Sequence, residues 1–456
     1  MEMLVRDIVA ACKGKLLCGD ENTVIHGVST DSRKIAPSTL FVPIKGERTD
    51  AHDYIASTFE KGAAATLTQE HDVMQDTHAW IKVDDTQTAL QQIAAAYRAQ
   101  FDIPVIGITG SVGKTTTKEM VALVLSAQLN IMYTDGNFNS QVGLPLTMFR
   151  IEPEHQAAVI EMGMSNFGEM SRLAQIASPS RAIMTNIGIS HIEQLKTQGN
   201  IMAEKLHITD RFDANSILFL NGDDTLLAGL KDKFSFKTVY FGTQPWCDYC
   251  AQDITSDGQK TVFTLVTVQG REQVVIPVLG IHNVSNALAA IAVANSLGIA
   301  SKKAISALSG YRPLAMRQQI HNVHGITVID DSYNASPDSM VGSMNVLSGL
   351  NNSGKTIAVL ADMLELGELS QKAHFSVGKY CAKTGVNVLI TVGERAAQIA
   401  EGARSANCAV ACYQFQNNEQ AIAKLHEILH EGDSVMVKGS RSMHTDEIVK
   451  DLLQLS

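Results

Sequence analysis

A β-rich run that leads through a glycine loop into a helical pattern constrains the fold of this chain more than any other feature. Residues 103–109 predict a buried strand, Gly110-Ser-Val-Gly113-Lys114-Thr115-Thr116 forms the loop, and the helical pattern continues to about Gln128. The glycines allow backbone N–H groups to turn toward an anion in front of the positive end of the helix. This order predicts an α/β domain with a phosphate site at the end of a parallel strand.

The side chains of the loop fit a nucleotide and its metal ion. Lys114 can neutralise the β- and γ-phosphates, and Thr115 can hold Mg²⁺ through its hydroxyl. The common spacing G-x-x-x-x-G-K-S/T is not met, because Ile108 stands where it has its first glycine. A plain strand-to-helix turn is the alternative, which the combination of glycines with Lys-Thr-Thr disfavours. The residues predicted to bind ATP here are Thr109, Gly110, Ser111, Val112, Gly113, Lys114, Thr115 and Thr116.

Apolar runs after the loop alternate with helix-like segments such as 169–177, which predicts parallel βα units. The predicted parallel strands lie at 157–162, 181–186 and 216–221. Between about 237 and 277 the runs become closely spaced, which predicts an antiparallel patch within the same domain. Its predicted strands lie at 238–241, 261–268 and 272–278, and a long helix is predicted at 284–297.

Gly310-Tyr-Arg-Pro313 marks a predicted boundary, after which a second α/β series begins. Its predicted buried strands lie at 326–329, 356–360, 388–392 and 434–437, which favours a Rossmann-like, doubly wound third domain. The first 84 residues lack a glycine loop and predict a small mixed α/β domain. The chain's 456 residues are enough for about three domains of ~100–200 residues each. We therefore expect domains at 1–84, 85–313 and 314–456.

The charge balance excludes several kinds of partner. Lys and Arg total 37 against 47 Asp and Glu, a formal net charge of −10, so no global basic field exists for nucleic acid or an anionic membrane. The acidic N-terminal segment lacks the apolar run of a signal peptide, and no stretch of about 18 apolar residues predicts a membrane-spanning helix. We expect a cytoplasmic protein.

Cysteine usage indicates free thiols. Seven cysteines are scattered, at 12, 18, 247, 250, 381, 408 and 412, without a repeated metal-ligand spacing. The pair Cys247 and Cys250 could be half a zinc site or a redox pair, but no second pair accompanies it.

Three residues outside the loop are candidates for metal chemistry. Glu161 follows an apolar strand where the strand's end meets the phosphate crevice, and the alternative is a solvated glutamate. His191 follows the next strand and could offer a neutral imidazole to a second metal ion, although a lone histidine is more often structural. Lys205 lies in a helix-like stretch, where a solvated surface lysine is the ordinary interpretation.

Taken together, these residues resemble the Mur ligase family across nearly the whole chain. Residues 109–116 resemble that family's phosphate loop, which also departs from the common spacing. The segment 279–290 is similar to the helix opening in which an Asn, here Asn283 or Asn286, contacts adenine. Arg317 and the segment 330–335, with Asp331, resemble third-domain elements that close over ribose and phosphates.

Within the family, the motifs resemble the branch that adds D-alanyl-D-alanine to a UDP-linked muramoyl tripeptide. The segment 136–147, with Asn137 and Asn139, resembles that branch's Gly-Asn-x-Asn segment, and residues 330–334 and 437–441 resemble its third-domain motifs. The Asp-Asn-Pro-Arg motif of the diaminopimelate-adding relative is missing. The resemblance also implies substrate-binding residues in the first domain: Ser29, Thr30, Asp31, Arg33, Lys45, Gly46, Thr49, Asp50 and His52. From the residues alone, these are polar loops with Arg33 and Lys45 available for phosphate.

The resemblance implies a mechanism and its cofactors. The lysine that matches Lys205 is carbamylated by CO₂ in relatives, so that Thr115 and Glu161 would hold a first Mg²⁺ and His191 with the carbamate a second. ATP would activate the tripeptide's carboxylate as an acyl phosphate, the third domain would close and bind the dipeptide, and we expect a monomer. Two alternatives stay open: a related ligase, such as a folylpolyglutamate synthase or another Mur ligase, and a regulatory ATPase module.

Overall fold

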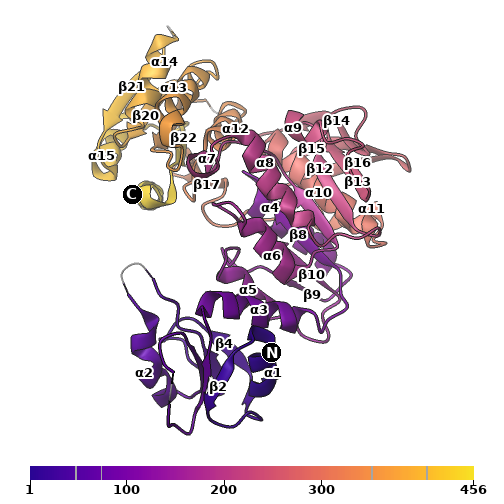
Figure 1. Ribbon diagram of the computed structural model, residues 1–456. Helices are drawn as coiled ribbons and strands as arrows, with labels where there is room; N and C mark the ends of the chain where they lie inside the picture. Colours follow the sequence, from indigo (N-terminus) through magenta and orange to yellow (C-terminus); the bar gives the residue numbers. More distant parts are fainter. Residues whose placement is uncertain (47–48, 73, 351–352, 407–408, 456) are drawn as a thin grey trace.

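Three sheets organise the chain in the computed structural model, which describes residues 1–456 except 47–48, 73, 351–352, 407–408 and 456. The parts built around these sheets are called here the first, central and third domains. In Figure 1 the first domain (indigo) lies below the central domain, and the third domain (orange to yellow) lies at the upper left. The central domain therefore carries the other two.

The first domain is a five-stranded sheet with the order β2-β7-β6-β5-β4. Its strands are β2 (Lys15–Cys18), β4 (Gly27–Ser29), β5 (Thr39–Phe41), β6 (Ala63–Thr68) and β7 (Ala79–Lys82), and β1 (Met3–Leu4) pairs with β3 (Val24–Ile25) beside it. Its helices are α1 (Val5–Cys12), η1 (Ala51–Tyr54) and α2 (Ile55–Glu60), and α3 (Thr86–Arg98) follows the last strand of the sheet. Because α3 contacts α1 as well as α5 and α6, it joins the core of this domain to that of the central one.

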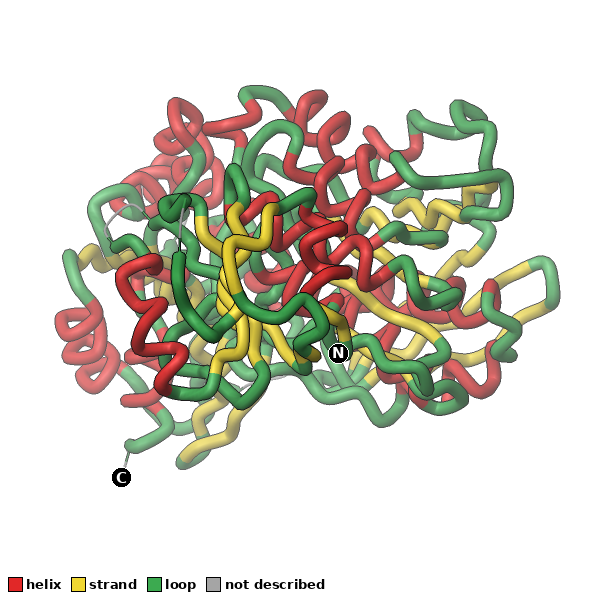
Figure 2. The backbone as a smooth tube through the Cα atoms, turned by 60° about the horizontal axis from the view of Figure 1, so that its bottom comes forward, coloured by secondary structure: helices red, strands yellow, loops and turns green. Residues whose placement is uncertain are grey.

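The central domain is a nine-stranded sheet with the order β16-β15-β14-β13-β12-β11-β8-β10-β9. Its parallel strands are β8 (Val105–Thr109), β9 (Ile131–Tyr133), β10 (Ala157–Glu161), β11 (Arg181–Met184), β12 (Ile217–Asn221) and β13 (Lys237–Gly242), followed by β14 (Tyr249–Ser256), β15 (Thr261–Thr267) and β16 (Gly270–Ile276). Its helices are α4 (Lys114–Ser126), α5 (Gly143–Met148), α6 (Glu169–Ala177), α7 (Ile192–Leu195), α8 (Gln198–Leu206), η2 (His207–Thr209), α9 (Thr225–Ala228), α10 (Ile281–Ser296) and α11 (Ser301–Leu308). Figure 2 shows the helices and strands of the whole chain from a second direction.

The antiparallel patch begins later than the sequence predicts. The run 238–241, expected within the patch, lies in β13, which pairs in parallel with both β12 and β14. Only β14, β15 and β16 are antiparallel to one another, and the sequence did not single out β14. A register shift between Gln252 and Thr255 interrupts the alternation of β14, which explains why its pattern is weak.

Side-chain alternation buries both faces of the central sheet. In β10, Ala158 and Ile160 pack into the core that also holds α6 and α8, while Ala157 and Val159 pack into the core beneath α4 and α10. Fully buried parallel strands are nearly continuous apolar runs for this reason. The glycine loop is thereby fixed between a buried strand and a buried helix.

The third domain is a six-stranded sheet with the order β17-β18-β22-β19-β20-β21, in which only the edge strand β17 is antiparallel to its neighbour. Its strands are β17 (Gln319–Val323), β18 (Ile326–Asp330), β19 (Thr356–Ala361), β20 (Val388–Val392), β21 (Ala411–Phe415) and β22 (Ser434–Lys438). Its helices are α12 (Pro337–Ser348), η3 (Gly367–Leu369), α13 (Ser370–Cys381), α14 (Ala397–Ser405), α15 (Asn418–Ile428), η4 (Arg441–Met443) and α16 (Asp446–Leu452). Helices α12, α13 and α14 contact one another in sequence, as do α15 and α16, and alternate residues of β19 face two different cores. The predicted doubly wound arrangement is confirmed.

Each large sheet lies within one of the ranges expected for a domain, and the exact boundaries stay a prediction. Among the described residues, no helix has both the length and the apolar character needed to cross a membrane.

Candidate active site

The glycine loop joins β8 to α4 at the end of the central sheet. Gly110 has φ 151° and Gly113, which precedes α4, has φ 85°, both in a region that side chains disfavour. A Cβ on Gly110 would lie 1.9 Å from Oγ1 of Thr185, and one on Gly113 would lie 3.1 Å from Oδ1 of Asn286. The glycines therefore allow both the turn and a close approach of neighbouring side chains.

Two residues after β11 hold the loop in place. The Ser111 N–H donates to the Asn186 carbonyl (3.1 Å), and the Val112 N–H donates to Oδ1 of Asn186 (2.9 Å). The hydroxyl of Thr185 donates to the Val112 carbonyl at 2.5 Å. Sequence reasoning did not name Thr185 or Asn186. Their position at the end of a predicted parallel strand, next to the loop's own strand, was the available signal.

Two lysines share one backbone carbonyl beneath the loop. Nζ of Lys114 donates to the Gly110 carbonyl at 2.8 Å, and Nζ of Lys205, from α8, donates to the same oxygen at 3.0 Å. Lys205 is only 2% exposed, so it is not the solvated surface lysine of the ordinary interpretation. Burial, and then repulsion from Lys114, lowers the pKa of Lys205 well below its usual value, although Glu204 opposes this. Burial also lowers the pKa of Lys114.

Glu161, at the end of β10, offers a buried anionic oxygen. The residue is 2% exposed, so it is not a solvated strand end. Its Oε1 accepts a hydrogen bond from Nδ2 of Asn139 at 2.7 Å, while Oε2 has no partner among the described residues. A buried carboxylate oxygen without a partner is costly unless a cation or another donor completes it. Thr115, which lines the same cavity and is 7% exposed, adds a hydroxyl, so this pair fits a divalent cation.

His191 lies where the central domain meets the third. Its Nδ1 is 2.6 Å from Oε2 of Glu365, which follows β19, although the two groups are too poorly aligned for a straight hydrogen bond. This contact lowers the pKa of Glu365, while burial of the carboxyl acts in the opposite direction. Sequence reasoning named His191 but not its carboxylate partner.

A chain of hydrogen-bonded amides connects α4, the helix that follows the glycine loop, to the third domain. Oγ1 of Thr117 donates to Oδ1 of Asn286 (3.0 Å), Nδ2 of Asn286 donates to Oδ1 of Asn283 (3.2 Å), and Nδ2 of Asn283 donates to Oε1 of Gln318 (3.2 Å). His282 reaches the same Gln318 oxygen at 2.9 Å. Both asparagines expected at adenine thus lie in one network that spans the two domains.

The two expected third-domain residues face the same space. The guanidinium of Arg317 lies 4.0 Å from the ring centroid of Tyr333. Oδ2 of Asp331 pairs with Nζ of Lys438 at 2.6 Å and accepts from Oγ of Ser343, so two donors hold this one oxygen. Stacking and ion pairing fix both groups before any ligand is bound.

One cavity of about 890 Å³ gathers residues of both domains. The predicted residues that line it are Ser111, Val112, Gly113, Lys114, Thr115, Thr116, Asn137, Asn139, Glu161, His191, Asn283, Asn286, Arg317 and Asp331. Thr109, Gly110 and Lys205 are not among the lining residues, and Lys205 reaches the loop only through the Gly110 carbonyl. A cavity that size, with cations, amides and a carboxylate, can hold a nucleotide and a second substrate.

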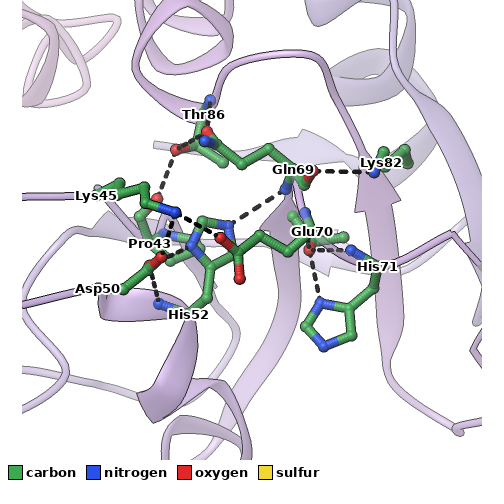
Figure 3. Close-up of polar contacts among 10 residues, drawn as sticks. Pro43, Lys45, Asp50, His52, Gln69, Glu70, His71, Lys82 and Thr86 are labelled. Carbon is green, nitrogen blue, oxygen red and sulfur yellow. Dashed lines mark hydrogen bonds and ion pairs between the residues drawn. The ribbon is translucent and has the colours of Figure 1, made fainter.

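The first-domain residues lie apart from this cavity: none of Ser29, Thr30, Asp31, Arg33, Lys45, Gly46, Thr49, Asp50 and His52 lines it. Arg33 forms a bidentate pair with Asp31, at 2.8 and 2.9 Å. In Figure 3, Lys45 points at the carboxylates of Asp50 (3.2 Å) and Glu70 (3.0 Å). Both predicted phosphate cations are therefore already paired with carboxylates.

The side chains of Asp50, His52 and Glu70 in Figure 3 are of the types that bind metal ions, but the ammonium of Lys45 already lies among them. Ligand atoms of Asp50, His52 and Glu70 lie within 4.8 Å of one another, and Nδ1 of His52 is 2.6 Å from Oδ1 of Asp50. The ammonium of Lys45 takes the place between the two carboxylates. Residues 47–48, between the predicted substrate-binding residues Gly46 and Thr49, lie outside the described residues.

The cysteines are free thiols, as predicted, at the six positions that the structure describes, and Cys408 lies outside the described residues. Cys247 and Cys250 are both buried, and burial raises the pKa of Cys247 to about 12. A protonated thiol is a poor metal ligand and a poor nucleophile. The zinc and redox interpretations of this pair find no support.

Three protein-family profiles match this chain. Residues 24–98 match "Mur ligase family, catalytic domain", residues 108–294 match "Mur ligase middle domain", and residues 316–441 match "Mur ligase, glutamate ligase domain". The UDP-N-acetylmuramoyl-tripeptide–D-alanyl-D-alanine ligase of Bacillus subtilis (strain 168) is 40% identical over 454 residues, 99% of this chain and 98% of that protein. The Escherichia coli (strain K12) ligase of the same name is 32% identical over 439 residues, 94% of each chain.

Solved structures agree with these relatives. A crystal structure of MurF from Acinetobacter baumannii superposes with a TM-score of 0.93 at 30% identity and covers 100% of this chain and 99% of that one. MurF ligase from Thermotoga maritima in complex with ADP has a TM-score of 0.85 at 26% identity, covering 94% of this chain and 97% of that one.

Proposed function

Because the chain belongs to the Mur ligase family, we propose that it joins D-alanyl-D-alanine to UDP-N-acetylmuramoyl-tripeptide. The products are UDP-muramoyl-pentapeptide, ADP and phosphate. The observation that carries this proposal is the full-length similarity to the Bacillus subtilis ligase of that name. The two-domain cavity with its loop lysine is the arrangement that such a ligase needs, since ATP and an acceptor must meet there.

ATP binds with its phosphates at the glycine loop. Lys114 supplies a positive charge to the transferring phosphoryl group, for which positioning and charge neutralisation provide most of the catalysis. Arg317 and Asp331 approach the nucleotide from the third domain, and Asn283 or Asn286 meets the adenine. The hydrogen-bond network from Thr117 to Gln318 then links the nucleotide site of the central domain to the third domain.

Two divalent cations fit the residues at the cavity. When bound, Mg²⁺ offsets the repulsion between ATP and the substrate carboxylate. Thr115 and Glu161 would hold the first ion, and the partnerless Oε2 of Glu161 supports this assignment. His191 and a carbamylated Lys205 would hold the second.

Carbamylation of Lys205 is supported by the state of its amine. Burial and Lys114 lower its pKa, which favours the unprotonated nitrogen that can attack CO₂. An N–C bond forms, one proton leaves the nitrogen, and a neutral amine becomes an anion. The resulting anion would also attract Lys114, whose Nζ shares the Gly110 carbonyl with Nζ of Lys205.

The reaction then proceeds in two transfers. The tripeptide's terminal carboxylate attacks the γ-phosphate, which gives an acyl phosphate and ADP. The amine of D-alanyl-D-alanine attacks the acyl carbon, and phosphate leaves from the tetrahedral intermediate. Because water would hydrolyse the acyl phosphate, the third domain must exclude water from the cavity during the reaction.

The remaining assignments follow the same proposal. The first domain, at 1–84, holds the UDP end of the substrate through the loops around Arg33 and Lys45, whose carboxylate pairs open to admit phosphate. The ranges 85–313 and 314–456 hold ATP and the incoming dipeptide. We place the enzyme in the cytoplasm as a monomer.

Mass spectrometry of the product tests the function. Purified protein is incubated with ATP, Mg²⁺, D-alanyl-D-alanine and a UDP-muramoyl tripeptide ending in either diaminopimelate or lysine. The expected product carries the mass of the tripeptide plus the dipeptide minus one water. Phosphate release without either substrate would favour a regulatory ATPase, and product formed only with a different amino acid or acceptor would favour a related ligase.

A further inference from the structure

The contact between His191 and Glu365 joins two domains at the edge of the cavity. His191 immediately precedes α7, and Glu365 lies in the segment between β19 and η3. In Figure 1, α7 lies where the central domain meets the third domain, and α7 and η3 are in contact. Besides the 2.6 Å side-chain approach, the N–H of Glu193 donates to the Glu365 carbonyl at 3.4 Å. The two segments are therefore held together through side chain and backbone.

Both partners have an unusual backbone conformation. His191 and Glu365 each have φ 62°, in the left-handed region that costs non-glycine residues about 1–2 kcal/mol. Gly367, close by at φ 51°, packs so tightly that a Cβ there would lie 3.2 Å from Cγ of Glu193. Such conformations persist where the surrounding structure imposes them, and they are concentrated at functional sites. Two of them on opposite sides of one contact indicate that the approach is imposed by the fold.

The contact leaves one imidazole nitrogen for a ligand. His191 lines the cavity, and Nε2 makes no hydrogen bond to the part of the chain that the structure describes. A neutral imidazole carries one N–H and one lone pair. A lone pair on Nδ1 would be repelled by the carboxylate oxygen 2.6 Å away, whereas an N–H there is attracted to it, so the geometry favours the tautomer with its lone pair on Nε2. Histidines that bind metal ions are oriented in this way by a carboxylate on the other nitrogen.

We propose that Glu365 is a positioning residue that holds His191 with Nδ1 protonated and Nε2 free for a divalent cation. This rests on the proposed function, which places a cation at His191. Because Glu365 belongs to the third domain, the cation site is complete only while that domain is docked on the central domain. Cation affinity and docking are then linked, so that each favours the other. The second cation therefore binds more tightly when the third domain is docked and the cavity is closed to water.

The experiment compares Glu365→Ala and Glu365→Gln with a matched control, Glu368→Gln. Glu368 is an exposed acid three residues along the same segment, so the control removes the same charge without touching His191. Glu365→Gln keeps an acceptor oxygen of similar size, whereas Glu365→Ala removes it. The Glu365 side chain is 55% exposed, so neither substitution opens the core.

The first readout is the tautomer of His191 by ¹⁵N-histidine NMR, with the signal assigned by its loss in His191→Gln. We expect the Nδ1–H form in the parent and control, and a tautomer mixture in Glu365→Ala. The second is Mn²⁺ binding, followed by electron paramagnetic resonance with a non-hydrolysable ATP analogue and UDP-tripeptide. Loss of such a partner typically weakens metal binding by about 10–100-fold. We expect this loss for the weaker of two ions in Glu365→Ala, partial recovery in Glu365→Gln and no loss in the control.

An unchanged tautomer and unchanged Mn²⁺ affinity in Glu365→Ala would overturn the proposal. An equal loss in the control would show a nonspecific charge effect and would overturn it too. Neither readout requires turnover, so both remain measurable if the parent forms no pentapeptide product. Failure of the positioning role is thus distinguishable from failure of the proposed function.

Discussion

Replacing Gly110 by Ala tests whether the conformation of the glycine loop is essential. The new Cβ would lie 1.9 Å from Oγ1 of Thr185, whereas ordinary contact begins at 3.4 Å, so the atoms must separate by about 1.5 Å. If Thr185 rotates, it loses its hydrogen bond to the Val112 carbonyl, worth about 1 kcal/mol. If the loop moves instead, the backbone N–H groups proposed to bind phosphate and the carbonyl under Lys114 move with it.

A displacement of about 1 Å in a catalytic group can cost about 100-fold in rate. We therefore expect Gly110→Ala to lower kcat about 100-fold or more, and overpacking to cost about 1–3 kcal/mol of stability. The assay follows ADP release in the complete ligation mixture, with thermal unfolding measured in parallel. A variant that turns over within threefold of the parent would refute the reasoning.

A second substitution identifies the clash as the cause. Thr185→Ala in the Gly110→Ala background removes the hydroxyl, while contacts of 3.1 Å to Cβ and 3.2 Å to N of residue 185 remain. We expect partial recovery, about tenfold, because φ 151° at residue 110 stays unfavourable for alanine. Thr185→Ser keeps the hydroxyl and serves as the control. If serine restored activity as well as alanine, the steric explanation would be wrong.

Four further outcomes are expected. Lys114→Ala should abolish turnover with near-parental thermal stability, and an active variant would contradict the phosphate-loop assignment. Lys205→Ala and Lys205→Arg should both lose most activity, because neither side chain can become a carbamate. In a ligation assay with Mg²⁺ titrated, acetate or formate should partly restore the activity of Lys205→Ala. Full activity of Lys205→Arg would rule the carbamate out. Glu161→Gln should raise the Mg²⁺ concentration needed for half-maximal rate by about tenfold or more, since a neutral amide is a weaker ligand for Mg²⁺; an unchanged Mg²⁺ dependence would remove Glu161 from the metal site. Small-angle scattering should show compaction with an ATP analogue plus UDP-tripeptide, because Arg317 and Lys114 come from different domains, and a constant radius of gyration would argue against closure.

The local pattern of hydrophobic residues was sufficient to predict most of the fold. The buried parallel strands were found because both of their faces are apolar, so β8, β10 and β19 are continuous hydrophobic runs. The edge strands β17 and β21 were missed because their residues are only partly buried and have no such run. The direction of β13 was also missed, since the pattern of one strand does not encode whether its neighbour is parallel.

The sequence by itself determined the residue types of the site and the glycine loop for which phosphate binding is predicted, because a strand, glycines, lysine and a helix are adjacent in the chain. Tertiary structure alone decided what each distant residue does. Lys205 belongs to an ordinary helical stretch and becomes buried against the Gly110 carbonyl, 95 positions away, only when α8 packs beneath the loop. Glu365 meets His191 only because two separately folded domains dock there. Burial, partner and protonation state depend on what surrounds a side chain in space, and a helix or strand period carries no information about those surroundings.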